Sequence, residues 1–273
     1  MDWIIGAIGA CLVAGAAYAK RSLSGSGAIA AIVMGTIYYG AGDLFWFGLL
    51  LLFFVTSSVL SRVKQAEKRQ AEQMYEKSGR RDAMQVFANG GIGMALCLCN
   101  YWLPSPVWFG LFVGVMATVT ADTWATEWGS LSRKPPRSVV TWKPLPAGTS
   151  GGVSLRGTAA SAVGAGMIGA AAAVLLGWTG TGPDIPLWQW IPAGLVGGTL
   201  GALTDSYLGA TVQVMYRCPS CGKLVETRQH CGTPTVRERG LSVMNNDAVN
   251  LMSSVCGGAL ALGMLTLAGR WFG

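Results

Sequence analysis

Charged residues are scarce in this sequence. They make up 12% of its 273 residues, and there is a single histidine. The mean hydropathy of +0.43 is too high, and the charge content too low, for an ordinary soluble domain. The chain also lacks an internal repeat and a low-complexity tail. The sequence therefore predicts one all-α domain over residues 1–273, a polytopic integral membrane bundle of about 7–8 transmembrane helices with short cytoplasmic loops.

Other missing features exclude three further classes of protein. The first apolar segment begins with Asp2 rather than with basic residues, so we interpret it as a retained span and not as a signal peptide. The net charge of +7 is not gathered in one soluble basic domain, which excludes a nucleic-acid partner. The seven cysteines do not form the pattern of a secreted disulfide framework.

Eight apolar segments have about the length that a membrane span needs, roughly 20 residues. They cover residues 3–19, 26–42, 44–60, 84–103, 106–128, 157–178, 187–212 and 247–270. The second is short and rich in small residues, so it is either a full span or a re-entrant segment. Glycine-rich stretches in the sixth and seventh predict close helix packing. The mixed charges at 61–82 are typical of a cytoplasmic helix.

Basic residues alternate along the chain with neutral connections. The connections at 40–43, 101–106 and 178–187 contain no Lys or Arg, whereas the loops between them are basic. The positive-inside rule therefore places the basic loops in the cytoplasm and both termini outside. We expect a multi-pass protein of the cytoplasmic (inner) membrane, in contact with membrane lipids, and a homo-oligomer is an open expectation.

Three carboxylates lie at the cytoplasmic ends of apolar segments. Asp122 and Glu127 belong to the fifth segment and Asp205 to the seventh. A carboxylate at this depth costs several kcal/mol unless it is paired, hydrated or bound to a cation. We expect these three to bind Mg²⁺, which takes oxygen ligands and bridges carboxylates to phosphates. The alternative is that they are helix-end residues that face water.

Other polar side chains are expected at the same level of the membrane. They are Lys20, Asn89, Asn245, Asn246 and Asn250. Because separate segments bring carboxylates, amides and a lysine to one cytoplasmic layer, we predict that this layer is the active site.

A glycine–serine loop before the sixth segment is a candidate phosphate site. Glycine lets a backbone approach a ligand closely, and a helix N-terminus presents free N–H groups. The loop lacks the lysine and the spacing of a P-loop, and a plain turn is the alternative. Its candidate residues are Gly148, Thr149, Ser150, Gly151, Gly152 and Ser154, with Arg156 just beyond.

The polar loop at about 214–242 contains Cys218, Cys221, His230 and Cys231. A Cys-x-x-Cys pair with two further soft ligands suits a structural Zn²⁺ ion. A reduced redox pair is the competing interpretation.

Six motifs give the chain a family resemblance. AYAKRSLSGSGAIAA, QVFANGG, ADTWATEWG, GTSGGVSLRGT, DSYLGATVQ and NNDAVN, spread over residues 17–250, resemble the membrane family catalogued as domain of unknown function ninety-two. That family includes the plant phytyl-phosphate kinase of tocopherol synthesis. The resemblance implies transfer of a phosphoryl group from a nucleoside triphosphate, with CTP expected, to an isoprenyl monophosphate. It assigns the site to Asn89, Asp122, Glu127, Asp205 and Asn246.

In the mechanism that we expect, Asp122, Glu127 and Asp205 hold Mg²⁺ on the nucleotide phosphates, while Lys20 and Arg156 offset negative charge. The amides and the glycine–serine loop position the phosphates. A phosphate acceptor is already ionised, so the scarcity of histidine is no obstacle. The alternatives are a lipid-phosphate cytidylyltransferase, a polyprenol kinase and an ion-coupled transporter.

Overall fold

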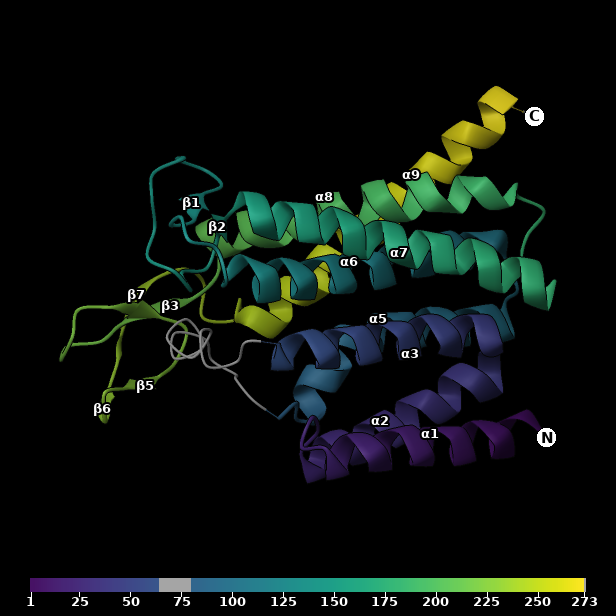
Figure 1. Ribbon diagram of the computed structural model, residues 1–273, viewed down its shortest axis with the longest axis horizontal. Coiled ribbons are helices and arrows are strands. Elements are labelled where there is room, and N and C mark those ends of the chain that lie inside the picture. Colours follow the sequence, from purple (N-terminus) through teal and green to yellow (C-terminus); the bar gives the residue numbers. More distant parts are fainter. Residues whose placement is uncertain (64–79, 273) are drawn as a thin grey trace.

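The computed structural model describes residues 1–63 and 80–272, with side chains as far as residue 268. Eight α-helices within these ranges lie side by side along the long axis of the molecule (Figure 1). Each corresponds to one of the eight apolar segments, so the predicted all-α membrane bundle is confirmed. They are α1 (Asp2–Ala19), α2 (Gly25–Ile37), α3 (Leu44–Arg62), α5 (Ala83–Trp102), α6 (Pro106–Gly129), α7 (Leu155–Thr179), α8 (Trp190–Thr211) and α9 (Asn246–Phe272).

Length and composition separate these helices. Among the described residues, α1, α3, α5, α6, α7 and α9 are long and apolar enough to cross a membrane. Helix α8 has 22 residues but is less apolar, because it is rich in glycine and contains Asp205. Helix α2 has 13 residues and continues into a π-helical turn, η1 (Tyr38–Gly42). The second apolar segment is thus helical in two geometries.

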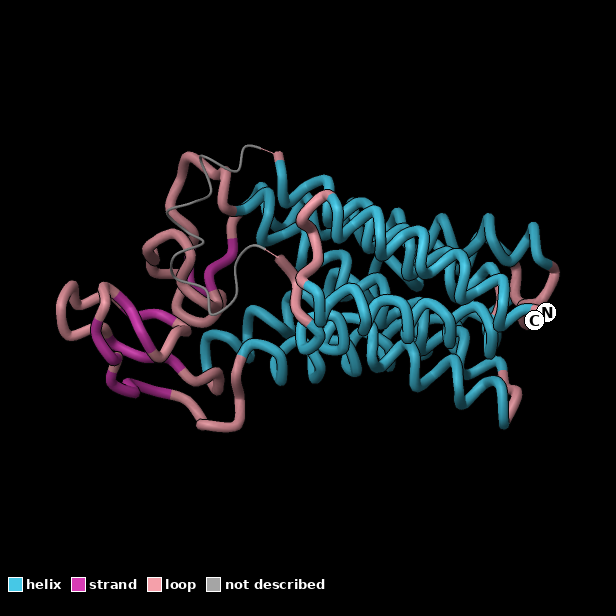
Figure 2. Tube along the Cα trace, turned by 90° about the horizontal axis from the view of Figure 1, so that it is seen from below, coloured by secondary structure: helices cyan, strands magenta, loops and turns pink. Residues whose placement is uncertain are grey.

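The two ends of the bundle differ. Both termini lie at one end, and the strands and long loops lie at the other (Figures 1 and 2). This arrangement agrees with the predicted topology, in which both termini share one side of the membrane. The cytoplasmic helix predicted at 61–82 falls mostly on residues 64–79, which lie outside the described residues, and α3 itself ends at Arg62.

Two of the connections at the strand end form small sheets. β1 (Arg137–Ser138) pairs with β2 (Gly152–Val153), and β5 (Gln229–His230) pairs with β6 (Thr233–Pro234). A three-stranded sheet has β3 (Met215–Arg217) between β4 (Leu224–Val225) and β7 (Val236–Arg239). The sequence did not predict these strands because runs of two to four residues are too short to show an alternating pattern.

Helices α6, α7, α8 and α9 pack closely on one another through small residues. A Cβ atom added at Gly194 of α8 would lie 2.7 Å from the Cα atom of Gly169 in α7, and one at Gly198 would lie 2.7 Å from the Cβ atom of Ala117 in α6. Lipid does not drive apolar surfaces together, so membrane helices associate where small residues let their backbones meet. The predicted close packing of the glycine-rich segments is confirmed.

Aromatic rings join α3 to α6 near the first turns of both helices. The Trp46 and Phe112 ring centroids are 4.4 Å apart, and those of Phe45 and Phe109 are 5.3 Å apart. All four side chains are buried. This cluster fixes the two helices at the end of the bundle that is opposite to the strands, and it leaves their other ends to form the polar face described next.

Candidate active site

The strand end of the bundle contains a polar cavity of about 940 Å³. It is bordered by helix ends, by the segment between α1 and α2, and by the loop between α6 and α7. The candidate catalytic and substrate-binding residues line it, with the exception of Arg156 and Asn245. Those that line it are Lys20, Asn89, Asp122, Glu127, Gly148, Thr149, Ser150, Gly151, Gly152, Ser154, Asp205, Asn246 and Asn250.

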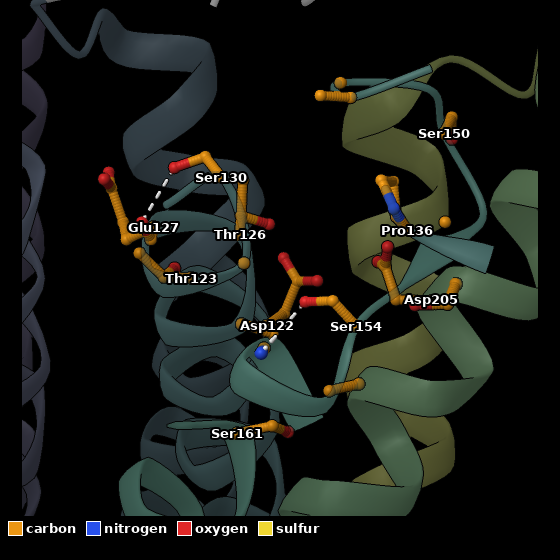
Figure 3. A pocket seen from close by; sticks show the side chains of 18 of the residues that line it. Asp122, Thr123, Thr126, Glu127, Ser130, Pro136, Ser150, Ser154, Ser161 and Asp205 are labelled. Carbon is orange, nitrogen blue, oxygen red and sulfur yellow. Dashed lines mark hydrogen bonds between the residues drawn. The ribbon is translucent and has the colours of Figure 1, made fainter. Parts of the chain in front are cut away.

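Asp122 of α6 and Asp205 of α8 point into the same part of this cavity (Figure 3). The Ser253 hydroxyl of α9 donates a hydrogen bond of 3.0 Å to Asp205 Oδ2, which orients that carboxylate. Carboxylate oxygens facing one another across a small polar space suit a hard divalent cation. The geometry of these two side chains therefore fits the cation that the sequence led us to expect.

Glu127 does not join this pair. Its side chain points away from Asp122 and Asp205 (Figure 3), and the Ser61 hydroxyl of α3 donates to Glu127 Oε1 over 2.5 Å. Among the described residues, the three carboxylates do not converge on one point closely enough to hold a single ion. Glu127 thus connects α3 to α6, whereas Asp122 and Asp205 face each other between α6 and α8.

The glycine–serine loop lies against the C-terminal end of α8. Gly151 has a φ of +84°, and a Cβ atom on it would lie 2.5 Å from the Cβ atom of Ala210, so only glycine fits there. The Ser150 hydroxyl donates to Gln213 Oε1 over 2.5 Å. The Ser154 hydroxyl accepts the Gly157 N–H group at 3.1 Å and caps α7. The sequence of this loop therefore fixes its backbone at the wall of the cavity.

The structure does not bring Arg156 and Asn245 to the cavity. The Arg156 guanidinium donates to the Leu131 carbonyl oxygen at 2.8 Å and so ties α7 to the turn after α6. Asn245 Oδ1 accepts the Ala248 N–H group at 3.0 Å, which makes Asn245 the N-cap of α9. Both residues belong to the motifs, but their side chains have structural partners.

The amides that do line the cavity come from the first turns of their helices. Asn89 Nδ2 donates to the Gln85 carbonyl oxygen at 2.9 Å, one turn earlier in α5. Gln85 itself forms a capping box with Asp82 at the start of that helix. Asn246 and Asn250 present the first turns of α9 to the cavity.

Sequence reasoning missed most of the basic groups in the cavity. Seven basic side chains line it against four acidic ones, so the cavity as a whole attracts anions. Their signal in the sequence was hidden, because basic residues are expected in every cytoplasmic loop whether or not they bind anything. The basic residues are Lys20, Arg21, Arg62, Arg80, Arg81, Arg133 and Lys134.

Arg81 is the most enclosed of these basic residues. Its Nη1 atom is buried and has no hydrogen-bond partner among the described residues. Its guanidinium lies over the rings of Phe53 and Phe54, at 5.7 and 5.8 Å from their centroids. Burial lowers the pKa of Arg81, while the negative charge of Glu127 acts in the opposite direction. A buried donor of this kind needs an anionic partner.

The backbone around Arg81 explains its fixed position. The Arg81 N–H group donates to the Ser22 carbonyl oxygen, and the Ser24 N–H group donates to the Arg81 carbonyl oxygen, each at 3.0 Å. Gly27 of α2 lets that carbonyl approach, since a Cβ atom there would collide with it. The SLSGSG motif therefore holds Arg81 at the start of α5.

A second, apolar pocket of about 60 Å³ adjoins the cavity. Side chains of α1, α2, α3 and α5 line it, among them Met34, Leu50 and Phe54. Arg81, Gln85 and Asn89 line both spaces. One polar and one apolar compartment thus meet at these three residues, of which Arg81 is the charged one.

Two further hydroxyl groups of the cavity wall lack partners. Thr149 Oγ1 and Ser161 Oγ are buried and have no hydrogen-bond partner among the described residues. Buried polar atoms in folded proteins are nearly always satisfied by protein, water or ligand. Their position suits a polar ligand in the cavity.

Beyond the cavity, the loop before α9 gathers the four soft ligands that the sequence singled out. Among the described residues, the ligand atoms of Cys218, Cys221, His230 and Cys231 all lie within 4.8 Å of one another. Burial opposes ionisation of the Cys218 thiol, but hydrogen bonds with His230, Cys221 and Ser220 outweigh it and lower its pKa to about 6. The cluster is separate from the carboxylates of the polar cavity.

The fold and the membrane-length helices define a multi-pass integral membrane protein with a polar cavity at one end of its bundle. The chain belongs to the integral membrane protein family DUF92, whose family model matches residues 8–258. This agrees with the family that the motifs resemble.

Several curated proteins are similar to this chain. Protein PGR of Arabidopsis thaliana is 33% identical over 261 residues, which cover 89% of this chain and 88% of that protein. An uncharacterized membrane protein of Methanocaldococcus jannaschii is 29% identical over 252 residues, or 92% of this chain and 90% of its own length. Protein VTE6, chloroplastic, of Arabidopsis thaliana is 28% identical over 153 residues, or 54% and 46%. No solved structure matches the chain.

Proposed function

We propose that this protein is a membrane-embedded isoprenyl-phosphate kinase, which transfers a phosphoryl group from CTP or another nucleoside triphosphate to a phytyl-phosphate-like lipid monophosphate at the cytoplasmic face. The observation that carries the proposal is the junction at Arg81, where a cationic polar cavity meets an apolar pocket. A molecule that satisfies both compartments has an anionic head and a hydrocarbon tail. The basic residues at this end of the bundle support the cytoplasmic side.

In this proposal the lipid phosphate binds Arg81, whose Nη1 atom has no hydrogen-bond partner within residues 1–63 and 80–272 and is a charge-assisted donor. The first carbons of the tail lie in the apolar pocket against Met34 and Phe54. The nucleotide phosphates lie along the glycine–serine loop, where the Thr149 hydroxyl has no hydrogen-bond partner in the part of the chain that the structure describes. The two anions then approach each other near Asp122 and Asp205.

Asp122 and Asp205 hold the metal ion in this scheme, since their carboxylates face one space. Mg²⁺, when bound there, neutralises charge on the phosphates and on the phosphoryl group in transfer. Glu127 has a different role from the one first expected. Its charge acts on Arg81, and its hydrogen bond to Ser61 holds α3 against α6.

The reaction needs little beyond this positioning. An oxygen of the lipid monophosphate forms a bond to the γ-phosphorus, and the bond from that phosphorus to the β–γ bridging oxygen breaks. The products are a lipid diphosphate and CDP. Because the acceptor oxygen is already ionised near neutral pH, no strong general base is needed. Lys20 and Arg62, which line the cavity, offset the negative charge.

The test uses detergent-purified protein, Mg²⁺, a panel of isoprenyl monophosphates and CTP or ATP labelled in either the α- or the γ-phosphate. We expect γ-label in a lipid diphosphate, and loss of that product in Asp122→Asn. The matched control is Asp184→Asn, an exposed carboxylate in the connection between α7 and α8, outside the cavity lining.

The other outcomes replace the proposal. The α-label in the lipid, with pyrophosphate released, would establish a cytidylyltransferase. If free polyprenol is supplied in a parallel reaction and the γ-label appears only in the polyprenyl monophosphate formed from it, the protein is an alcohol kinase. If folded protein binds no nucleotide and forms no product, the kinase is refuted and transport becomes the function to test.

A further inference from the structure

Two tight turns converge in the connection between α8 and α9. The first joins β3 to β4, where the Gly222 N–H group donates to the Cys218 carbonyl oxygen at 2.9 Å and the Cys218 N–H group donates to the Lys223 carbonyl oxygen at 3.0 Å. The second joins β5 to β6 through Cys231 and Gly232, which have φ values of +52° and +72°. Each turn supplies two soft ligands, Cys218 with Cys221 and His230 with Cys231.

The four ligand atoms have the spacing of a tetrahedral centre. His230 Nδ1 lies 3.4 Å from Cys221 Sγ and 3.2 Å from Cys231 Sγ, and all four atoms lie within 4.8 Å of one another. Zinc bound at about 2.3 Å to sulfur and about 2.0–2.1 Å to nitrogen places its ligand atoms roughly 3.5–3.8 Å apart. The two nitrogen–sulfur distances are slightly below this range, and no pair of ligand atoms has to close by more than about 1 Å for an ion to bind.

The strands and apolar side chains of the connection between α8 and α9 contribute little to its stability. Its strands have two to four residues, and few of its apolar side chains are buried, among them Val214, Met215 and Val225. Units of this size need a disulfide, a metal or a partner to hold their shape. A disulfide uses only two of the three cysteines and gives no role to the histidine whose Nδ1 atom faces two of the sulfurs.

We infer that Cys218, Cys221, His230 and Cys231 bind one structural Zn²⁺ ion, with three thiolates and the Nδ1 atom of neutral His230 as ligands. Binding releases the thiol protons to solvent and changes no oxidation state. The four protein ligands close the coordination sphere, which is the arrangement of structural rather than catalytic zinc. The inference does not depend on the reaction proposed for the cavity.

The zinc centre also bears on the polar cavity. Val225, in the strand that follows the first turn, pairs with Tyr216, and the next residue, Glu226, lines the cavity. Gln213 Nε2 donates to Glu226 Oε1 at 3.0 Å, and Gln213 Oε1 accepts the Ser150 hydroxyl. The metal therefore holds a loop whose hydrogen bonds reach the glycine–serine loop.

Metal analysis of the full-length protein, purified in detergent without chelator, tests this inference. We expect about one zinc per chain in the wild type and in Cys11→Ser, which changes a cysteine exposed on α1. Cys221→Ala is expected to lose at least tenfold in zinc affinity, measured by competition with a chromogenic chelator. His230→Cys is expected to keep the metal as a four-sulfur centre.

Replacement of zinc by Co²⁺ provides a second readout that does not depend on stability. Three thiolates and one imidazole should give the intense visible absorption of tetrahedral cobalt, and His230→Cys should shift it. Any of three results overturns the inference. The first is that the wild type contains no metal and does not take up Zn²⁺ or Co²⁺, and the second is that Cys218 and Cys221 form a disulfide in the protein as purified. The third is that folded Cys221→Ala keeps the zinc affinity of the wild type.

Discussion

The two halves of the bundle are packed differently. In α6, the helix at the centre of the second half, 67% of the most apolar stretch is buried, compared with 22% in α1 and α5 of the first half. Helices α6–α9 contact one another through glycine and alanine. Helices α1, α2, α3 and α5 pack less closely and leave the apolar pocket between them.

The halves also supply different parts of the candidate site. Asp122, Asp205 and the glycine–serine loop belong to the closely packed half, whereas Arg81 and the apolar pocket belong to the loosely packed half. The two carboxylates lie on α6 and α8, which pack so closely that neither helix can shift without the other. The apolar pocket lies where packing is sparse. In the proposed kinase, the nucleotide would therefore bind on the rigid side, and the lipid would bind on the side that can adapt.

The largest effect is expected in the rigid half. Asp205→Asn should lower kcat by on the order of 10²- to 10³-fold, about 3–4 kcal/mol, because it removes an anionic ligand from the carboxylate pair. Steady-state kinetics of the kinase reaction measure this. Ser253→Ala removes a hydroxyl whose two acceptors are Asp205 Oδ2 and the Asn250 carbonyl oxygen, but keeps the Asp205 carboxylate, and should cost about tenfold or less. Equal turnover in Asp205→Asn and wild type would remove Asp205 from the site.

A more selective loss is expected on the lipid side. Arg81→Gln should lower kcat/KM for the lipid phosphate by about 10- to 100-fold, since a charge-assisted hydrogen bond contributes roughly 1.5–3 kcal/mol. The KM for the nucleotide should change by less than about twofold, because the proposal places the nucleotide phosphates along the glycine–serine loop and not at Arg81. Arg237→Gln is the control, as Arg237 is exposed and outside the cavity lining. A parallel loss for both substrates would contradict the assignment of Arg81 to the lipid.

The free energy of unfolding should also distinguish closely packed positions from open ones. Helix α9 contains a glycine of each kind. Gly257→Ala in α9 places a methyl group against Thr118 of α6 and should lower the free energy of unfolding by about 1–3 kcal/mol. Gly263→Ala in the same helix meets no atom within 4 Å and should change it by about 0.5 kcal/mol or less. Unfolding in mixed micelles of mild detergent and dodecyl sulfate measures both, and equal losses would refute the packing argument.

The smallest effect is expected where the halves meet. Ser61→Ala removes the hydrogen bond to Glu127 that joins α3 to α6, and should cost about 0.5–1.5 kcal/mol of stability. Ser61→Thr keeps the hydroxyl group and should restore most of the loss. If neither variant differs from wild type in unfolding, Glu127 does not hold the two halves together through this serine.

The helices could be predicted because each apolar segment is about as long as a span, and charged residues mark its ends. The acidic and amide parts of the candidate site could be predicted for a related reason. A carboxylate such as Asp205 inside an apolar segment is costly, so its presence is informative. A basic residue in a cytoplasmic loop carries no such information, which is why Arg81 was missed.

Side-chain direction and tertiary pairing could not be read from the sequence. Arg156 and Asn245 belong to motifs that reach the cavity, yet their side chains bind Leu131 and cap α9. Likewise, Glu127 lies five residues after Asp122, so it faces a different side of α6 and meets Ser61. Arg81 was not predicted, although its place directly before the Asp82 capping box is a signal that could have drawn attention to it.

The junction at Arg81 also determines in which units the concentration of a lipid substrate should be expressed. Its apolar side lies among membrane helices and its polar side opens into the cavity, so in the proposed reaction a lipid phosphate would bind without leaving the bilayer. The relevant amount of such a substrate is its mole fraction in the membrane or micelle and not its amount per volume of solution. Adding detergent at constant lipid should then slow the reaction by surface dilution, while the dependence on the water-soluble nucleotide stays unchanged.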